Sequence, residues 1–234
     1  MQLDLLPTRH GSAAENMAID FLLLQAYPTP NVRFRHYGWH RPAFTFGYGQ
    51  TLEFVRSQLP AEENVEICRR PTGGGVVDHR NDWTYCLVIP AEHVLCEARA
   101  TESYRLVHTC IRDAFISLGE HAELNEATNE AAAAGPGVCF TKAEVHDVVK
   151  PQTRAKIAGA AQKRSKRGML FQGSIARATM TPSFDWERFQ DAFTSYLAQA
   201  LETLAQHAPW PDIPEEMLQG LIDQYSSEDW NGYR

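Results

Sequence analysis

Three consecutive glycines follow a pair of arginines in the segment RRPTGGGVVDH, residues 69–79. Because glycine has no Cβ, such a backbone can approach a ligand closely and direct N–H groups toward it, and Arg69 or Arg70 can neutralise an anionic group nearby. No Gly-Lys-Ser/Thr follows, and the spacing is not that of a dinucleotide-binding fingerprint. The segment therefore predicts either a ligand-binding loop of another kind or an ordinary turn.

Cys139 is a candidate nucleophile. It comes shortly after Gly135-Pro136-Gly137, where we expect a strand to begin. Neighbouring cations make a thiol more nucleophilic by stabilising its thiolate, and Lys156, which opens the segment KIAGAAQKR, can face Cys139 across a hairpin. The simpler alternatives are a buried, inert cysteine and a lysine that keeps an edge strand soluble.

Two histidines are further candidates for acid or base chemistry. His79 ends the glycine-rich segment, and His146 precedes Asp147 on an expected strand. Neighbouring side chains on a strand point to opposite faces, so we do not expect His146 and Asp147 to act as a dyad. A solitary histidine is more often a surface or hydrogen-bonded residue than a catalytic one.

Helical and strand patterns alternate irregularly along the chain, which indicates an α+β fold with a mostly antiparallel sheet flanked by helices. The helix signals are a capping box at Ser12–Glu15 and apolar residues at helical spacing. Expected helices cover residues 12–27 and 101–118, an apolar stripe from 186 to 204 behind the cap candidates Ser183 and Asp185, and roughly 214–225. Expected strands cover 32–37, 43–49, 65–70 and 82–90, followed by a loop at 121–137 and a β-meander through 138–177.

The charge distribution narrows the choice of partners. The 234 residues include 22 basic and 29 acidic side chains, a net charge of −7, which argues against general binding of nucleic-acid backbones. Seven basic residues nevertheless lie within 150–167 without an acidic one. This run is either a solvated hairpin or a docking surface for an acidic partner.

Cysteine use and hydropathy indicate a cytoplasmic protein. The five cysteines are odd in number and show no metal-ligand spacing, so we expect reduced thiols and no metal. The first residues lack the basic and apolar regions of a signal peptide, and no apolar run is long enough to span a membrane. We therefore expect neither export nor membrane insertion.

Several segments in order resemble the lipoate-protein ligase/octanoyltransferase family, a branch of the biotin and lipoate protein ligases. They are ENMAID (15–20), FTFGYGQ (44–50), RRPTGGGVVDH (69–79), DWTYCL (82–87), VCF (138–140), KIAGAAQKR (156–164), GMLFQGSIA (168–176) and YSSEDWN (225–231). The resemblance implies a single catalytic domain over residues 1–234 and a tunnel for an octanoyl chain. Its implied walls are Arg70, Gly73, Gly74, Gly75, Val76, Val77 and His79 on one side and Lys156, Ala158, Gly159 and Ala160 on the other.

By the same resemblance, Lys156 contacts the acyl carbonyl, and Cys139-Phe140 looks like the pair of the cysteine-dependent octanoyltransferase branch. The implied reaction takes octanoyl from octanoyl-acyl-carrier protein onto Cys139 as a thioester. It then passes to a lysine of a lipoyl domain, of a 2-oxoacid dehydrogenase E2 subunit or the glycine-cleavage H protein. No cofactor is implied for this route.

Three other functions remain open alternatives. The first is an ATP-dependent lipoate-protein ligase, which would use ATP and Mg and in which Cys139 merely packs. The second is an octanoyl amidotransferase acting between two lipoyl-type proteins. The third is a non-enzymatic binding relative. This sequence departs from the family pattern at Gln172, where relatives commonly have histidine, in the longer turn PQTR (151–154), and at His146-Asp147.

Overall fold

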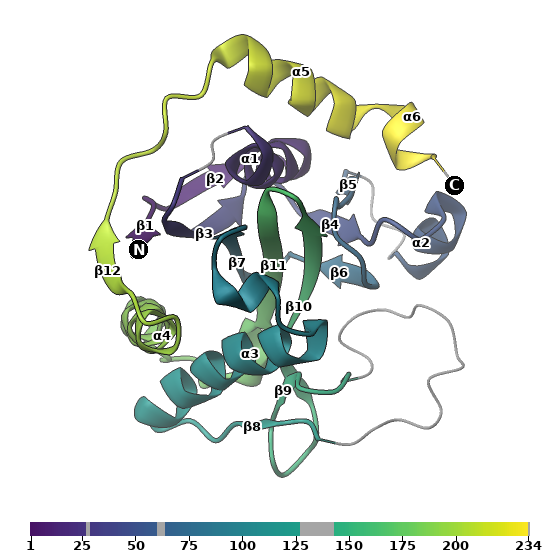
Figure 1. The fold of residues 1–234 in the computed structure, drawn as a ribbon. Helices are drawn as coiled ribbons and strands as arrows, with labels where there is room; N and C mark the ends of the chain where they lie inside the picture. Colours follow the sequence, from purple (N-terminus) through teal and green to yellow (C-terminus); the bar gives the residue numbers. More distant parts are fainter. Residues whose placement is uncertain (27–28, 60–63, 127–142, 234) are drawn as a thin grey trace.

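The computed structural model of the chain describes residues 1–26, 29–59, 64–126 and 143–233 (Figure 1). In these residues the strands form two sheets, a large one and a small one of three strands. None of the helices in the described ranges is both long and apolar enough to cross a membrane.

Helix α1 (Ala13–Gln25) begins as the sequence predicts. Its N-cap Ser12 accepts a hydrogen bond from the Glu15 amide, and the Glu15 carboxylate accepts one from the Ser12 amide. This capping box satisfies two amides that the first helical turn leaves without partners. The helix is buried on most sides, including at the polar residues Asn16 and Asp20.

The centre of the large sheet is antiparallel, as expected. Its strand order is β12-β1-β3-β7-β11-β10-β9-β8, and β2 also pairs with β3. The pairs of β3 with β7, β7 with β11 and β11 with β10 are antiparallel, whereas β1 is parallel to both β3 and β12. The bounds are β1 Gln2–Leu5, β2 Arg9–Gly11, β3 Val32–Trp39, β7 Asp82–Pro90, β8 Glu123–Leu124, β9 Val148–Val149, β10 Lys156–Ser165, β11 Gly168–Ala176 and β12 Leu204–His207.

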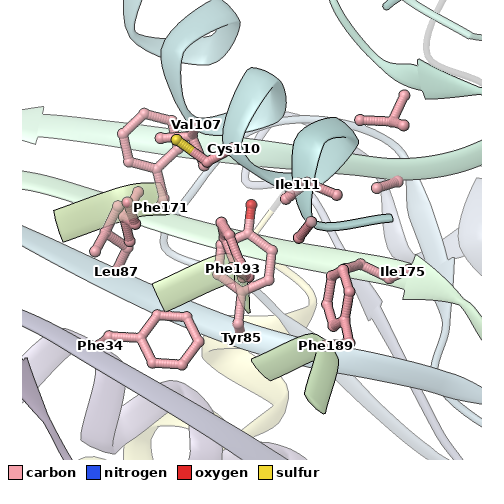
Figure 2. Close-up of a cluster of buried hydrophobic side chains, with 14 of the residues drawn as sticks. Phe34, Tyr85, Leu87, Val107, Cys110, Ile111, Phe171, Ile175, Phe189 and Phe193 are labelled. Atoms are coloured by element: carbon pink, nitrogen blue, oxygen red, sulfur yellow. The ribbon is translucent and has the colours of Figure 1, made fainter. Parts of the chain in front are cut away.

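The two faces of this sheet differ in chemistry. One face packs on α3 (Ala100–Ser117) and α4 (Trp186–Ala200) through an aromatic core that contains Phe34, Tyr85 and Phe193 (Figure 2). The other face packs on α1, where apolar contacts flank a group of buried polar side chains. Side chains alternate between faces along each strand, so one strand supplies both environments.

The small sheet stands beside α1 and consists of β4 (Ala43–Phe46) between β5 (Glu66–Arg69) and β6 (Val76–Asp78). The remaining described helices are α2 (Leu52–Gln58), α5 (Glu215–Ser226), α6 (Glu228–Asn231) and the 3₁₀ turns η1 (Val94–Cys96) and η2 (Arg177–Thr179). Helix α5 crosses the outer side of α1 (Figure 1). Strands β1, β2, β6 and β12 and helices α2 and α6 have no counterpart among the elements expected from the sequence, and β8 lies at the start of the segment 121–137, where a loop was expected.

Two sequence-based expectations are wrong in detail. His146 and Asp147 do not lie on a strand but in a turn over 143–147, where His146 has a left-handed φ of 70°. The apolar stripe that was expected to continue to Leu204 ends with α4 at Ala200. The chain reverses at Glu202, with φ of 52°, and Leu204 then opens β12.

Candidate active site

A pocket lies between the small sheet and the α1-facing side of the large sheet. The space between its lining atoms, open solvent included, amounts to roughly 480 Å³. Seven of the residues that line it are glycine, alanine, valine or methionine, and eight carry polar side chains. The lining residues are Met17, Tyr37, Thr45, Arg70, Gly74, Val77, His79, Thr84, Lys156, Gly159, Ala160, Ala161, Gln172, Gly173 and Ser174.

Most of the residues implied by the family resemblance meet at this pocket, although they come from distant parts of the sequence. Those that line it are Arg70, Gly74, Val77, His79, Lys156, Gly159 and Ala160. Val76 and Ala158 instead point into hydrophobic clusters, because alternation along β6 and β10 turns them away from the pocket side. Gly73 and Gly75 contribute carbonyl oxygens to Arg70.

Arg70 shapes the glycine-rich loop from inside. Its Nη2 donates to the carbonyls of Gly73 (2.7 Å) and Gly75 (3.0 Å), and its Nη1 donates to Thr45 Oγ1 (2.9 Å). Gly74 has φ of 89°, which favours glycine. The loop packs so closely on Gly47 that a Cβ there would lie 2.0 Å from the Gly74 carbonyl oxygen. Arg70 is thus committed to the loop that forms the pocket wall.

Arg69 points the other way and ties distant backbone together. Its guanidinium donates to the carbonyl oxygens of Tyr48, Gln50, Trp230 and Asn231 at 2.7–2.9 Å. The side chain is fully buried. Of the two arginines that the sequence offered for an anion, Arg69 therefore anchors the C-terminal helix α6 and only Arg70 lines the pocket.

His79 is held at both ring nitrogens by protein groups. Its Nδ1 donates to Asp82 Oδ2 (2.7 Å), because a carboxylate accepts, and its Nε2 lies 2.7 Å from Thr45 Oγ1, which also accepts from Arg70. Asp82 also accepts from the hydroxyls of Ser174 and Thr84. These contacts favour the hydrogen-bonded interpretation of His79 over an acid or base role.

Lys156 brings a cation to the pocket. Its Nζ lies 2.8 Å from Asp147 Oδ2, and the two side chains are only 8% and 6% exposed. The lysine side chain lies across Gly159, where a Cβ would come within 2.5 Å of Lys156 Cε and 2.6 Å of Nζ. The glycine of the Lys-Ile-Ala-Gly segment therefore provides the room for the lysine.

Sequence reasoning missed the buried ion pair behind the pocket. Asp20 Oδ1 lies 3.2 Å from Arg35 Nε, with both side chains almost completely buried, and burial raises the pKa of Asp20. Gln172 Nε2 donates to Asp20 Oδ2 (2.7 Å) while its Oε1 accepts from Thr72 (2.8 Å). Gln172 stands where the family resemblance leads us to expect histidine. Through these two hydrogen bonds it connects α1 to the segment before the glycines. The only sequence signal for this pair was the position of Asp20 in ENMAID.

Fewer of the seven basic residues are available to bind an acidic partner than the sequence suggested. Lys150 pairs with Glu120, Arg154 with Glu123 and Lys156 with Asp147. Arg164 donates to the carbonyls of Cys96 and Ala98. Cys139, the candidate nucleophile, lies outside the described residues, so its position relative to Lys156 stays a prediction. Among the described residues no cluster of three potential metal ligands occurs.

The fold and the pocket define an α+β protein with a pocket beside a buried lysine, between a small sheet and the α1 side of a large one. A model of the lipoyl protein ligase A/B catalytic domain matches residues 12–213. The chain therefore belongs to this family, as its motifs suggested.

Relatives support this assignment, and a solved structure shares the fold. Octanoyltransferase LipM of Halalkalibacterium halodurans is 33% identical over 172 residues, 69% of this chain but only 61% of that relative's length. Octanoyltransferase LipM of an Exiguobacterium species is 30% identical over 242 residues, 95% of this chain and 86% of the relative. The putative lipoate protein ligase Ta0514 of T. acidophilum, solved with lipoic acid, has a TM-score of 0.77 at 18% identity and covers 100% of both chains. The last match confirms the expected fold.

Proposed function

We propose that this protein is an octanoyltransferase that takes an octanoyl group from octanoyl-acyl-carrier protein and delivers it to a lysine of a lipoyl domain. The observation that carries the proposal is the Lys156 ammonium in a pocket with glycine, alanine, valine and methionine walls. Such walls suit an alkyl chain, and a cation beside them suits the acyl carbonyl, on which negative charge develops during transfer. The names of the LipM relatives agree with this chemistry.

In the first step the Cys139 thiolate attacks the carbonyl carbon of the donor thioester. Lys156 stabilises the negative charge that develops on the carbonyl oxygen. The bond to the carrier sulfur breaks, and the carrier leaves as a thiol after taking up a proton. The product is an octanoyl thioester on Cys139.

In the second step the neutral amine of the target lysine attacks the Cys139 thioester. The carbon–sulfur bond breaks, the thiolate of Cys139 is regenerated, and the new amide nitrogen loses a proton. Because an amide is more stable than a thioester, the transfer needs no ATP. We propose lipoyl domains of 2-oxoacid dehydrogenase E2 subunits or the glycine-cleavage H protein as acceptors.

Intact-mass spectrometry after incubation with octanoyl-acyl-carrier protein, without ATP, tests this function. We expect one added octanoyl group that hydroxylamine removes, its absence in Cys139→Ala, and its transfer to an added lipoyl domain. Cys96→Ala is the matched control, since Cys96 is half-buried and lies away from the pocket lining. A Cys139→Ala variant that still octanoylates the lipoyl domain would overturn the covalent mechanism.

Parallel reactions separate the alternatives. Pyrophosphate release from ATP with free octanoate or lipoate, at a rate unaffected by Cys139→Ala, would identify a ligase. Adduct formation from an octanoylated lipoyl domain but not from the carrier protein would identify an amidotransferase. Binding of a lipoyl domain without transfer from any donor would identify a non-enzymatic relative.

A further inference from the structure

Lys156 stands at an irregular position of its sheet. It opens β10, and the pairing of β10 with β9 shifts register between Lys156 and Ala158. A lysine at a strand end normally extends into water, because its ammonium is strongly hydrated. Here it is almost completely buried and ends at the carboxylate of Asp147. The position of its amine therefore depends on the position of Asp147.

Asp147 is held by its own turn. Its Oδ2 accepts from the Glu144 amide (2.7 Å) as well as pairing with Lys156, and its amide donates back to the Glu144 carbonyl (3.1 Å). This reciprocal pair of hydrogen bonds fixes the carboxylate relative to the backbone. One oxygen thus connects the turn to the lysine.

Asn125, which follows β8, makes several hydrogen bonds to the turn 143–147. Its side-chain amide donates to the carbonyls of Ala143 (3.3 Å) and Glu144 (3.0 Å). Its backbone accepts from the His146 amide (2.7 Å) and donates to the Asp147 carbonyl (2.8 Å). Asn125 is buried, so these bonds do not compete with bulk water.

His108 of α3 makes a hydrogen bond to the backbone of the turn 143–147. Its Nδ1 lies 2.7 Å from the carbonyl oxygen of His146, which accepts, so Nδ1 carries a proton. The side chain is 1% exposed, and burial lowers its pKa. A neutral His108 therefore stabilises the left-handed backbone conformation of His146. That conformation directs the next residue, Asp147, toward the pocket.

We propose that Asp147 is a positioning residue, whose carboxylate, fixed by the turn 143–147 with Asn125 and His108, places the Lys156 ammonium over Gly159 in the pocket. The role of Asp147 in catalysis rests on the proposed function, whereas its role in placing Lys156 does not. Truncating one member of a buried ion pair removes the charge that compensates the other within that pair. The lysine of an Asp147→Asn variant consequently relaxes toward solvent.

Amine labelling tests the placement without any assay of activity. Wild type and Asp147→Asn are treated with trinitrobenzenesulfonate for short times, and peptide mass spectrometry gives the labelling rate at each lysine. We expect Lys156 to label at least about fivefold faster in Asp147→Asn, with Lys150 unchanged. Glu120→Gln is the matched control, because Glu120 pairs with Lys150 at 2.7 Å, and it should accelerate Lys150 alone. An unchanged Lys156 rate in Asp147→Asn overturns the proposal.

Gly159→Ala provides a second route if Asp147→Asn does not fold. Its new Cβ would lie 2.6 Å from Lys156 Nζ and 3.0 Å from Asp147 Oδ1, so it would force the lysine side chain away from the carboxylate. We expect Lys156 of Gly159→Ala to label faster as well. Where Asp147→Asn does not fold, a wild-type labelling rate at Lys156 in Gly159→Ala overturns the proposal instead.

A double-mutant cycle tests the catalytic part. We expect Asp147→Asn to slow octanoyl adduct formation about tenfold or more when Lys156 is present, and to have little further effect in Lys156→Met. An equal loss in both backgrounds would show that Asp147 does not act through Lys156. If wild type forms no adduct with any donor, the proposed function fails, and the labelling rates alone decide the placement.

Discussion

The ring of Tyr85 lies directly against Gly173. The two residues face each other on β7 and β11, and a Cβ at Gly173 would come within 2.1 Å of Tyr85 Cε1 and 2.5 Å of its hydroxyl oxygen. The ring continues into the aromatic core against Phe193 and Phe34 (Figure 2). The glycine that lines the pocket thus makes room for an aromatic ring on the opposite face of the sheet.

Gly173→Ala is therefore expected to destabilise the fold, although alanine normally suits a strand better than glycine. The added methyl group meets a rigid, fully buried ring, and overpacking of this kind costs about 1–3 kcal/mol. Urea unfolding measures the change. Gly220→Ala is the matched control, because Gly220 lies in α5 with nothing within 4 Å of its Cβ position, and it should stabilise the protein by up to about 1 kcal/mol. Equal stability of Gly173→Ala and wild type would contradict the packing described.

Arg69→Lys should destabilise the protein and loosen its C-terminal helix. A lysine keeps the charge but cannot reach the four carbonyl oxygens, and each buried group left unsatisfied costs about 1–3 kcal/mol. We expect a loss of more than about 3 kcal/mol in urea unfolding and faster proteolysis near Trp230. Arg80→Lys, which alters an exposed pair with Asp78, should change stability by less than about 0.5 kcal/mol. Similar losses in the two variants would argue against this anchoring role.

Stability should fall on mild acidification because of His36. Burial lowers the pKa of His36 from 6.5 to about 4, and its ring stacks on Trp83 at 4.3 Å. In that interval the unfolded chain binds a proton that the folded protein does not, so unfolding becomes easier as the pH falls from 6.5 toward 4. The contribution is about 3 kcal/mol and is complete above pH 6.5.

Urea unfolding at several pH values, for wild type and His36→Gln, isolates this contribution. Glutamine can still donate to the Thr84 carbonyl that His36 Nδ1 contacts at 2.8 Å, but it does not titrate. The difference in unfolding free energy between the two proteins should therefore depend on pH between 4 and 6.5. A constant difference across that range would rule out His36 as the cause.

Gln172→Glu should make stability depend on pH in the opposite sense. The substitution puts a second carboxylate 2.7 Å from Asp20 Oδ2, in a site where burial already raises the pKa of Asp20. The pair holds a proton more tightly when folded, so stability is lost as the pH rises and recovers as it falls. We expect a loss of more than about 2 kcal/mol at pH 7, with partial recovery near pH 5.

Gln162→Glu is the control for this effect. Gln162 lies on the adjacent strand β10 and already accepts from Arg164, so a carboxylate there meets a cation instead of another acid. Its stability should change little between pH 5 and 7. If Gln172→Glu shows the same flat profile, the contact between Gln172 and Asp20 does not persist in solution.

Much of the fold was predictable because its signals are local. The capping box at Ser12 fixes the start of α1, and the helical spacing of apolar residues defines α3, which stops near Gly119 with φ of 85°. The antiparallel hairpin of β10 and β11 follows from two apolar runs around a short turn. The short strands β1, β2, β6 and β12 have no comparable signal, since they are defined by partners that are distant in sequence.

The sequence by itself determined the four longer helices α1, α3, α4 and α5, the central strands, the family and the segments that meet at the pocket, because each depends on the order of neighbouring residues. Only the tertiary structure decided what those residues do. It directed Arg69 to backbone carbonyls and Arg70 to the loop, turned Val76 and Ala158 into the core, and brought Asp147 to Lys156. These outcomes depend on which face of an element is covered and which distant group approaches it, and burial then makes an unpaired charge too costly to leave alone.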